Sequence, residues 1–536
     1  MPVLVPEPEP EPEAVPGAGC RVVAVLPEVA AIDKELDYLV PPGLSRSVHV
    51  GSVVRVQVGG RRMAGWVVAD DVSPPEGLVL KPLARVTGWG PGPELLPLAS
   101  WAAWRWAGRR AQLLRTASPL GAVRALPSPL GVSGVASAAP TAGVGAEAEA
   151  ARAGSLRALV EEAAAKGTAI VRLAPASDAT KVVLSLVGRG AVLAVVPARH
   201  QALGLARSVR EAGLSVAVLP EDWAQARAGA AVVVGTRAAV WGPCAGLAAV
   251  VVVDAHDESL GQQAAPTWHA SVVAAERARR SGVPCVLLSP CPTLEQVQRW
   301  PVVLPSRSEE RAGWAPLEVV DMRRQDPRSG LWSPRLVELA RRSSLLLCVL
   351  NRTGRIRLLA CASCGEIARC EACQGAMAQP VADGPLVCTR CGLTRPKVCA
   401  GCGSSVLKSL RIGVSRARDD LAAVTGKEVA EVTAATGEIP THGAVVGTEA
   451  VLRRGAVADA VVFVDFDQEL LAPRYRAGEE ALGLLALAAR TVGGRQGGGR
   501  VMVQTRLPRH PVLEAAVGAD PSRLTGAEAP SRRQLG

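Results

Sequence analysis

Eight cysteines between residues 361 and 402 are the residues whose types and spacing point most directly to chemistry. They form four Cys-x-x-Cys pairs, namely Cys361/Cys364, Cys370/Cys373, Cys388/Cys391 and Cys399/Cys402. The two sulfurs of each pair converge on one point, and two pairs supply the four thiolates of a tetrahedral zinc site at about 2.3 Å from the ion. Glycines around the pairs allow the tight backbone turns that such a site requires. The segment therefore predicts two structural zinc ions.

The order in which the four pairs combine follows from the lengths of chain between them. Only five residues separate Cys364 from Cys370, which is short for two pairs on one ion, whereas Gln374–Val387 gives the two inner pairs a comfortable loop. We therefore expect nesting, in which the inner pairs share one ion and the outer pairs share the other. Disulfides would require a secreted chain and a redox dithiol normally comes as one pair. An iron–sulfur cluster stays open as the alternative centre.

The composition is that of a large basic protein with several cores. The 536 residues suffice for several domains, and a hydrophobic content of 49% supports large cores. No apolar run of about 18 residues is free of charges or breaks, so we expect no membrane span. The net charge is +11 and most basic residues are arginine, which favours a nucleic-acid partner. Five single cysteines in apolar runs are typical of a reduced protein, and we expect a cytoplasmic, nucleoid-associated location.

The first 153 residues divide by composition into four segments. A Pro-Glu repeat covers residues 1–18 and is typical of a disordered tail. Short Val-rich strands with Gly turns cover 19–90 and predict a small β-barrel-like domain. Residues 91–125 predict a winged-helix-like helical segment, and the Ala/Gly/Pro/Ser-rich stretch 126–153 predicts a linker.

Val-rich apolar runs alternate with Ala- and Arg-rich helical windows through most of the remaining chain. The pattern predicts parallel sheets covered by helices on both faces, first in a lobe with its connector over 154–335. A second lobe is predicted over 336–360 and 404–506, interrupted by the zinc-binding module at 361–403. Residues 507–536 are expected to be a C-terminal tail. The fold class is therefore multidomain α/β.

This layout and several separate motifs resemble the primosomal protein N′ (PriA) family of replication-restart helicases, from about residue 20 to about 515. KELDYLVPPGL and VGSVVRVQVGGRRMAGWVV resemble the N-terminal DNA-binding domain of the family. VVVGTRAAVWGP and QQAAPTWHA resemble its helicase core, and RTVGGRQGGGRVMVQT resembles its last helicase motif. The eight cysteines match its zinc module in spacing. The resemblance implies two RecA-like lobes, with the zinc module inserted in the second.

The phosphate-binding loop of the family is broken in this chain. A working member has a loop of the form G-x-x-x-x-G-K-T, which cradles phosphates with backbone N–H groups and a lysine. Here the matching stretch, Leu173–Thr180, reads LAPASDAT. Both glycines are missing, Ala179 stands in place of the lysine, and Asp178 adds a repulsive charge; Thr180 alone survives. We therefore expect no bound ATP.

The other nucleotide motifs have also changed. Where the second motif should read Asp-Glu-x-His, the chain reads Asp254-Ala-His-Asp, which keeps a carboxylate for magnesium and loses the one that activates water. The last motif keeps Arg495, but Gly498 replaces its second arginine. Phosphoryl transfer depends almost wholly on positioning and electrostatics. We therefore assign no catalytic residue, and Thr180, Asp254 and Arg495 form a degenerate nucleotide site.

In the family, the segment around Asp-Tyr forms a pocket for the 3′ end of a nascent strand at a fork. The matching residues are Leu36, Asp37, Tyr38 and Gly51. A carboxylate accepts a hydrogen bond from a terminal 3′-hydroxyl, and a tyrosine ring stacks on the end base. The alternative, in which Asp37 caps a turn and Tyr38 is a core residue, stays open. Arg61 and Arg62 are candidate phosphate contacts, with a solvated loop as the alternative.

The helical stretch after the N-terminal domain combines tryptophan with arginine. Trp101 and Trp104 are three residues apart, and this spacing favours a core stripe over a binding surface. Arg105, Arg109 and Arg110 cluster beside them, and for these side chains phosphate contact is slightly favoured over solvation.

The resemblance, together with these observations, implies a DNA-binding primosome protein for replication restart. It is expected to recognise stalled or branched forks and single-stranded DNA, to meet other primosomal proteins, and to help reload the replicative helicase without unwinding DNA itself. An active ATP-dependent 3′–5′ helicase is one alternative, supported by overall resemblance and opposed by the broken loop. A zinc-ribbon scaffold that binds a protein and no DNA is the other, opposed by the arginine content.

Overall fold

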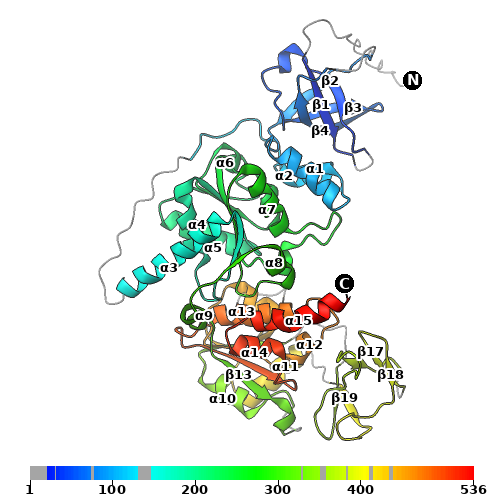
Figure 1. Ribbon diagram of the computed structural model, residues 1–536, viewed down its shortest axis with the longest axis vertical. Helices are drawn as coiled ribbons and strands as arrows, with labels where there is room; N and C mark the ends of the chain where they lie inside the picture. Colours follow the sequence, from blue (N-terminus) through cyan, green and yellow to red (C-terminus); the bar gives the residue numbers. More distant parts are fainter. Residues whose placement is uncertain are drawn as a thin grey trace, which may run out of the picture.

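The structure is a computed structural model that describes residues 21–29, 32–73, 78–130, 146–326, 330–350, 358–381, 384–409, 414–433 and 439–535. An N-terminal antiparallel domain, a first parallel-sheet lobe (lobe 1) and a second (lobe 2) follow one another along the long axis (Figure 1). A small cysteine-rich module lies beside lobe 2 (Figure 1). The predicted Pro-Glu tail, residues 1–18, lies outside the described residues.

The N-terminal domain is a five-stranded antiparallel sheet in the order β2-β1-β4-β3-β5. Its strands are β1 (Val22–Pro27), β2 (Leu36–Leu39), β3 (Val53–Val58), β4 (Arg61–Asp70) and β5 (Arg85–Gly88). A bridge between Leu39 and Pro82 joins the outer strand β2 to the segment that leads into β5. The backbone hydrogen bond from Leu83 to Leu39 strengthens that contact. This contact therefore links β2 to the segment before the other outer strand, β5.

Two helices, α1 (Leu95–Arg105) and α2 (Arg110–Ala117), lie between this sheet and lobe 1 (Figure 1). Their apolar faces join one core with lobe 1, and Trp223 of lobe 1 donates its indole N–H to the carbonyl of Ala117 at 2.9 Å. From residue 91 to residue 130 the structure has no strand pair that would form a wing. The winged-helix-like prediction is therefore wrong, because two amphipathic helices do not by themselves specify a third element.

Lobe 1 is a seven-stranded sheet in the order β12-β6-β11-β10-β7-β9-β8, and all its recorded strand pairs are parallel. Its strands are β6 (Thr168–Val171), β7 (Ala191–Val195), β8 (Val216–Val218), β9 (Val232–Gly235), β10 (Leu247–Val252), β11 (Cys285–Leu288) and β12 (Val302–Val303). Its helices are α3 (Ala146–Ala165), α4 (Ala179–Leu186), α5 (Arg199–Glu211), α6 (Trp223–Ala228), α7 (Ala270–Ser281) and α8 (Leu294–Arg299). One buried cluster lies on each face of the sheet, so helices cover both faces as predicted.

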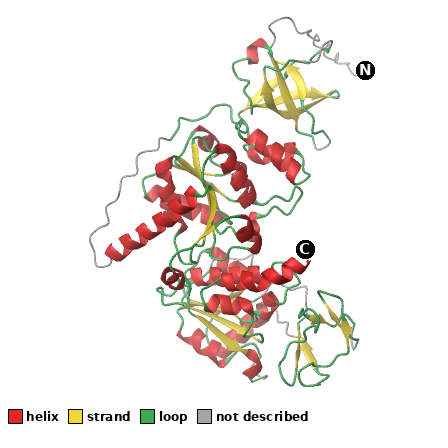
Figure 2. Cartoon of the chain, viewed as in Figure 1, coloured by secondary structure: helices red, strands yellow, loops and turns green. Residues whose placement is uncertain are grey.

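Lobe 2 is a six-stranded parallel sheet in the order β13-β23-β22-β14-β21-β20, reached through α9 (Arg307–Gly313). Its strands are β13 (Leu317–Asp321), β14 (Leu345–Val349), β20 (Val429–Val432), β21 (Gly443–Gly447), β22 (Ala460–Phe463) and β23 (Arg500–Thr505). Its helices include α10 (Pro334–Arg342), α11 (Val414–Thr425), α12 (Asp467–Leu470) and α13 (Ala477–Thr491). The figure coloured by secondary structure shows helices on both sides of this sheet (Figure 2).

Two boundaries of the predicted lobes need correction. Strand β13 was expected in the first lobe, but it pairs with β23 of lobe 2 because it follows the connecting helix α9. The stretch 126–153 was expected to be a linker, but α3 already begins at Ala146. Residues 131–145 of that stretch lie outside the described residues.

The last described residues form two helices and not an extended tail. They are α14 (Pro511–Val517) and α15 (Ser522–Leu535). Val512, Leu513 and Ala516 are buried in the core of lobe 2. Apolar residues at helical spacing therefore hold this segment on the lobe, and the prediction of a tail is wrong.

The cysteine-rich module consists mainly of turns and loops (Figure 2). Its short strands are β15 (Leu359–Cys361), β16 (Met377–Ala378), β17 (Leu386–Cys388), β18 (Thr394–Arg395) and β19 (Leu407–Ser409). Leu358, Ile367 and Ala376 pack against Leu471 and Leu507 of lobe 2. An apolar contact therefore fixes the module to this lobe.

None of the helices in the described part of the chain is both long and apolar enough to span a bilayer.

Candidate metal centres, interlobe contacts and DNA-binding domain

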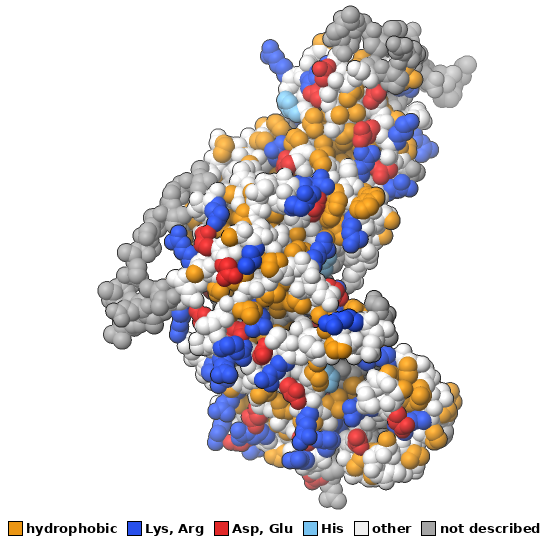
Figure 3. Space-filling model, viewed as in Figure 1, with side chains coloured by type: hydrophobic (Ala, Val, Ile, Leu, Met, Phe, Trp, Pro, Cys, Tyr) orange, Lys and Arg blue, Asp and Glu red, His pale blue; other side chains and the backbone are white. Residues whose placement is uncertain are grey.

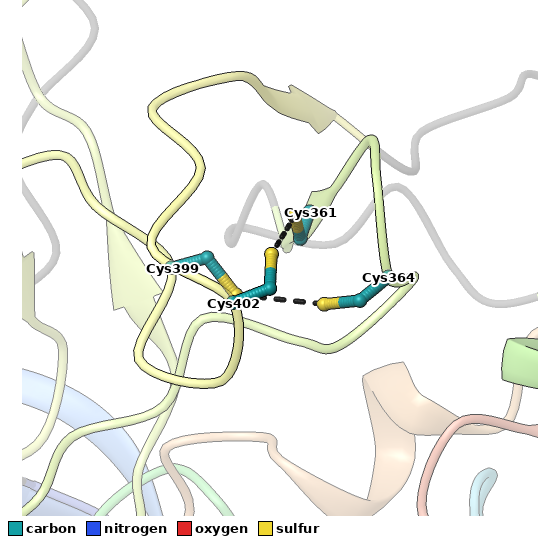
Figure 4. A group of neighbouring side chains, drawn as sticks. All are labelled: Cys361, Cys364, Cys399 and Cys402. Carbon is teal, nitrogen blue, oxygen red and sulfur yellow. Dashed lines mark hydrogen bonds between the residues drawn. The ribbon is translucent and has the colours of Figure 1, made fainter.

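The eight cysteines form two groups of four, and the grouping is nested. Cys361, Cys364, Cys399 and Cys402 make the outer group, which Figure 4 shows converging on one point. Cys370, Cys373, Cys388 and Cys391 make the inner group. Within each group the sulfur atoms lie within 4.8 Å of one another. The predicted nesting is confirmed.

The spacing of the sulfurs fits a tetrahedral metal centre. The shortest sulfur–sulfur separations are 3.5 Å for Cys361–Cys402 and for Cys373–Cys388. Four sulfurs at about 2.3 Å from a zinc ion would be about 3.8 Å apart, which is close to these distances. The dashed contacts in Figure 4 therefore stand in for thiolates that share one ion. Each group could hold one metal ion.

All four Cys-x-x-Cys turns repeat one local conformation. In each turn, the N–H four residues after the first cysteine donates to the carbonyl of that cysteine, at 2.9 to 3.1 Å. The donor residue has positive φ in every case; three of these residues are glycine and the fourth is Gln374, at φ 58°. Residues other than glycine rarely adopt this backbone conformation. Turn geometry thus explains why glycine follows three of the pairs.

The degenerate phosphate-binding loop leads from β6 into α4. The carboxylate of Asp178 caps α4, because its Oδ1 accepts a hydrogen bond from the backbone N–H of Thr180 at 2.8 Å. In a nucleotide-binding protein this helix N-terminus faces a phosphate. Here a negatively charged side chain of the chain itself satisfies it, and this opposes binding of another anion.

Asp254 follows β10 and is 6% exposed. Arg490, near the end of α13, donates from both terminal nitrogens to the two carboxylate oxygens, each at 2.6 Å. Its Nε also donates to the carbonyl of Pro175 in the degenerate loop, at 2.8 Å. Burial alone would raise the pKa of Asp254, but the charge and hydrogen bonds of Arg490 outweigh it and lower the pKa to about 2. Arg490 of lobe 2 thus contacts both the carboxylate of Asp254 and the degenerate loop of lobe 1.

The position of the lost catalytic carboxylate is closed to solvent. Ala255 is 0% exposed and its carbonyl accepts a hydrogen bond from Gln296 at 2.6 Å. His256 follows, with its Nδ1 3.0 Å from the hydroxyl of Ser289. Burial lowers the pKa of His256. No carboxylate lies at this position to activate a water molecule.

Further polar contacts join the two lobes around Arg490. Arg453 of lobe 2 pairs with Asp257 at 2.7 Å. Glu479 of α13 accepts a hydrogen bond from the backbone N–H of Leu294 at 2.6 Å. Arg476 pairs with Glu295 at 3.2 Å. Side chains of both lobes thus hold the lobes together.

Of the predicted nucleotide-site residues, Asp254 is in the interlobe contact, whereas Arg495 contacts the connecting helix α9. Arg495 is exposed, its backbone N–H donates to Ala312 and its Nε donates to the carbonyl of Arg311 at 3.4 Å. The role of Arg490 was not predicted from the sequence. The loss of the lysine was a signal, because it left the buried Asp254 carboxylate without a cation nearby.

The predicted 3′-end residues lie on β2 and at the turn before β3. Tyr38 is 3% exposed, packs in the core of the sheet and donates its hydroxyl to the carbonyl of Gln57 at 3.0 Å. Successive strand residues point to opposite faces, so Asp37 lies on the face away from this core. The Tyr38 ring therefore offers no face to a base, and it is the core residue that the alternative described. The side chain of Asp37 is partly exposed, and nothing among the described residues hydrogen-bonds to it.

The remaining predicted DNA contacts fall on turns and on the hairpin of β3 and β4. Gly51 has φ 92°, and a Cβ there would lie 1.9 Å from the carbonyl oxygen of Pro91, so only glycine fits. Leu36 packs against the core with Tyr38. Arg61 and Arg62 begin β4 and are exposed. Their guanidinium groups are accessible to a phosphate.

The arginines of the Trp-Arg helices separate into two groups. Arg110 pairs with Asp33 at 2.9 Å and with Glu35 at 2.5 Å, and its charge is therefore balanced within the domain. Arg115 pairs with Glu28 at 3.4 Å. Arg105 and Arg109 form no ion pair with any residue in the described part of the chain.

Comparisons with known proteins agree with the layout. A family model described as the 3′ DNA-binding domain of PriA matches residues 21–119, which includes α1 and α2. The replication restart protein PriA of Synechocystis sp. is 28% identical over 61% of this chain and 44% of the relative. The probable replication restart protein PriA of Mycobacterium tuberculosis is 29% identical over 95% of this chain and 83% of the relative.

The alignment with the Synechocystis relative thus spans less than half of that protein. Among solved structures, S. cerevisiae Dbp5 bound to RNA and ADP BeF3 aligns with a TM-score of 0.36 and 12% identity, over 69% of this chain and 90% of that chain. That likeness is too distant to support an argument. The domain match over residues 21–119, the similarity to the mycobacterial relatives over 95% of the chain and the nested cysteines support the PriA family of replication restart proteins as the family of this chain.

Proposed function

We propose that this chain is a DNA-binding primosome protein that recognises stalled or branched forks and helps reload the replicative helicase, without ATP-driven unwinding of its own. The pairing of Arg490 with both oxygens of Asp254 is the observation that supports this most directly. In a working helicase, the corresponding carboxylate would serve the magnesium ion of a bound nucleotide.

A nucleotide would have to displace contacts that the protein already makes. Removing one partner of a buried ion pair costs about 3–5 kcal/mol, because the other charge stays buried and alone. Asp178 would also repel the phosphates from the α4 N-terminus, where Ala179 offers no positive charge. Arg490 supplies a positive charge in place of the lost lysine, and it already contacts Asp254 and the carbonyl of Pro175. The two lobes then serve as a rigid body that separates the DNA-binding domain from the zinc module.

DNA recognition is proposed to lie in the N-terminal domain. Asp37 presents a partly exposed carboxylate on the face away from the sheet core, where it can accept a hydrogen bond from a 3′-hydroxyl. Arg61 and Arg62 are exposed beside that sheet and can contact phosphates. The net charge of +11 adds a favourable long-range attraction to a fork.

The cysteine-rich module is proposed to hold two zinc ions and to meet other primosomal proteins. Its exposed apolar side chains support a protein contact; they are Val381, Leu393, Val398 and Val406. Two zinc ions, each bound by four thiolates, would keep these loops in place, because the module has little core of its own.

Strand separation and fork binding measured on one sample test this proposal. The unmodified chain should bind a labelled fork with an exposed 3′ end more tightly than blunt duplex, and at constant magnesium the affinity should not change when ATP is added. It should not separate the strands of that fork. Separation that requires ATP would establish the alternative, an active helicase, and absence of fork binding would favour the zinc-ribbon scaffold.

A further inference from the structure

Trp104, on α1, is the one exposed tryptophan of the eleven in the chain, all of which lie in described residues. Its side chain is 79% exposed. The neighbouring Trp101 and Trp106 are partly buried and meet edge to face, with ring centroids 5.4 Å apart. Trp101 therefore belongs to the apolar stripe of α1, whereas Trp104 points away from it. An exposed indole does not contribute the favourable free energy of burying its apolar surface. Such a side chain is typical of a binding site.

A cavity of about 590 Å³ opens beside Trp104 at the junction of the N-terminal sheet, α1 and α7. Its wall is largely apolar, formed by Leu96 and Pro97 of α1 together with Trp101 and Trp104. Arg280 of α7 lines it as well. In the space-filling view, hydrophobic and basic side chains lie next to one another around this junction (Figure 3). A flat apolar group can enter here with positive charge close by.

The charged residues that line this cavity are paired, Arg110 with Glu35 and Arg280 with Glu276, whereas two arginines near it are not. Arg105 lies beside the Trp106 ring at 5.8 Å, and Arg299 lies over the Trp300 ring at 5.0 Å. Burial and, secondly, the charge of Arg105 lower the pKa of Arg299, and the charge of Glu276 opposes this in part. Neither has an ion-pair partner among the residues that the structure describes. Two such cations attract an anion that lies between them.

We propose that Trp104 and the adjoining cavity bind an unpaired nucleotide of single-stranded DNA, with its base stacked on the indole. Arg105 and Arg299 contact the phosphates on either side of that nucleotide. Stacked aromatic rings flanked by arginines are how proteins hold single strands with little sequence preference. An acidic peptide would satisfy the arginines but would leave the indole and the apolar cavity without a flat partner.

This inference rests on the proposed DNA-binding function and extends it to a second site. Helix α1 lies within residues 21–119, the segment that matches a 3′ DNA-binding domain. Trp104 is on a helix of that domain and Asp37 is on its sheet, so a 3′ end and an unpaired nucleotide can be bound at once. The site would therefore favour forks with a single-stranded gap beside the 3′ end.

Binding of a labelled oligo-dT strand to the full chain tests the site, with Trp104→Ala, Trp104→Phe and a matched control. Val457→Ala serves as the control, because Val457 is 82% exposed on lobe 2. Trp104→Ala should weaken oligo-dT binding by about tenfold, since each stacked base contributes strongly. Trp104→Phe should retain most of the affinity, and Val457→Ala should retain all of it. Arg105→Ala should reduce the salt dependence by about one released counterion.

Unchanged oligo-dT binding by Trp104→Ala, with fork binding intact, would overturn this inference and leave the proposed function standing. Loss of affinity for a primosomal protein, with DNA binding unchanged, would show that the patch is a protein site and would also overturn it. An unmodified chain that binds neither forks nor oligo-dT would overturn both. Equal unfolding temperatures of the variants ensure that an affinity change reports the site.

Discussion

Arg490 of lobe 2 holds both carboxylate oxygens of Asp254 in lobe 1, each at 2.6 Å, across the boundary where a helicase would hold its nucleotide. The same guanidinium group donates to the carbonyl of Pro175 in the degenerate loop. Arg490 thus supplies the positive charge that the lost lysine would have supplied. It neutralises the buried carboxylate of Asp254. It also joins the degenerate loop of lobe 1 to α13 of lobe 2.

Arg490→Ala should destabilise the protein by about 3 kcal/mol, because the buried Asp254 carboxylate then loses its cation and keeps only the hydrogen bond from Gln201. Urea unfolding followed by circular dichroism measures the change. Arg495→Ala is the matched control, since Arg495 is exposed and five residues away; it should cost less than about 0.5 kcal/mol.

The double variant Arg490→Ala/Asp254→Asn should be more stable than Arg490→Ala alone, because no buried charge is left unpaired. Additive effects of the two substitutions would mean that the pair does not couple the lobes.

Acid should weaken this contact in a defined pH range. The pKa of Asp254 is about 2 in the folded protein against an ordinary value of 3.8. A lowered pKa gives stability that is fully present above about pH 4 and is lost as pH falls toward 2, worth about 2 kcal/mol. Unfolding free energies of the unmodified chain and of Asp254→Asn should therefore converge below pH 4. Parallel pH profiles for the two proteins would contradict this.

The metal content of the module should be two zinc ions per chain by elemental analysis, since each nested group offers four thiolates. Cys370→Ser with Cys373→Ser should remove one ion and leave the other. A separate variant, Cys361→Ser with Cys402→Ser, should remove the other ion, which the outer group holds. One zinc per chain, or iron with a visible absorption band, would contradict two zinc sites.

Asp37→Ala should lower the preference for a fork with a 3′-hydroxyl over a 3′-phosphate more than it lowers overall affinity. Tyr38→Phe should leave DNA binding unchanged, because the ring is buried, and should cost about 1 kcal/mol of stability by leaving the Gln57 carbonyl unpaired. Fluorescence anisotropy with both forks measures the preference. Equal affinity of the unmodified chain for the two forks would rule out a pocket for the 3′-hydroxyl.

Local geometry made some features predictable from sequence. A Cys-x-x-Cys turn fixes its own shape, so spacing alone predicted the nested groups. Strand alternation could also have separated Asp37 from Tyr38, since neighbours on a strand face opposite ways. The apolar spacing of Val512, Leu513 and Ala516 was a helix signal that the prediction of a tail overlooked.

Other features depend on how distant elements pack. Arg490 and Asp254 are 236 residues apart in the chain, and their contact exists only because two separate lobes close on each other. Sequence identifies a carboxylate that has lost its lysine but not which arginine replaces it. The exposure of Trp104 is of the same kind, because its spacing from Trp101 is also that of a core stripe.

Restoring single parts of the nucleotide site should not restore catalysis. Ala179→Lys leaves Asp178 on the helix N-terminus and Arg490 on Asp254, so the new charge meets no phosphate. Ala255→Glu would place a carboxylate at a position that is 0% exposed and should destabilise the protein by about 1–3 kcal/mol. Urea unfolding and nucleotide binding by equilibrium dialysis check both variants. Binding of ATP by Ala179→Lys would show that the contacts of Arg490 with Asp254 and Pro175 do not exclude a nucleotide.

DNA-stimulated ATP turnover tests the central claim most directly, measured on the unmodified chain with a fork that it binds and compared with Asp254→Ala. Asp254 would hold the magnesium ion of any bound nucleotide, so residual hydrolysis must fall when it is removed. The pairing of Arg490 with Asp254 predicts that the two samples show the same background turnover, with or without the fork. Turnover by the unmodified chain that rises with fork DNA and is absent from Asp254→Ala would contradict it.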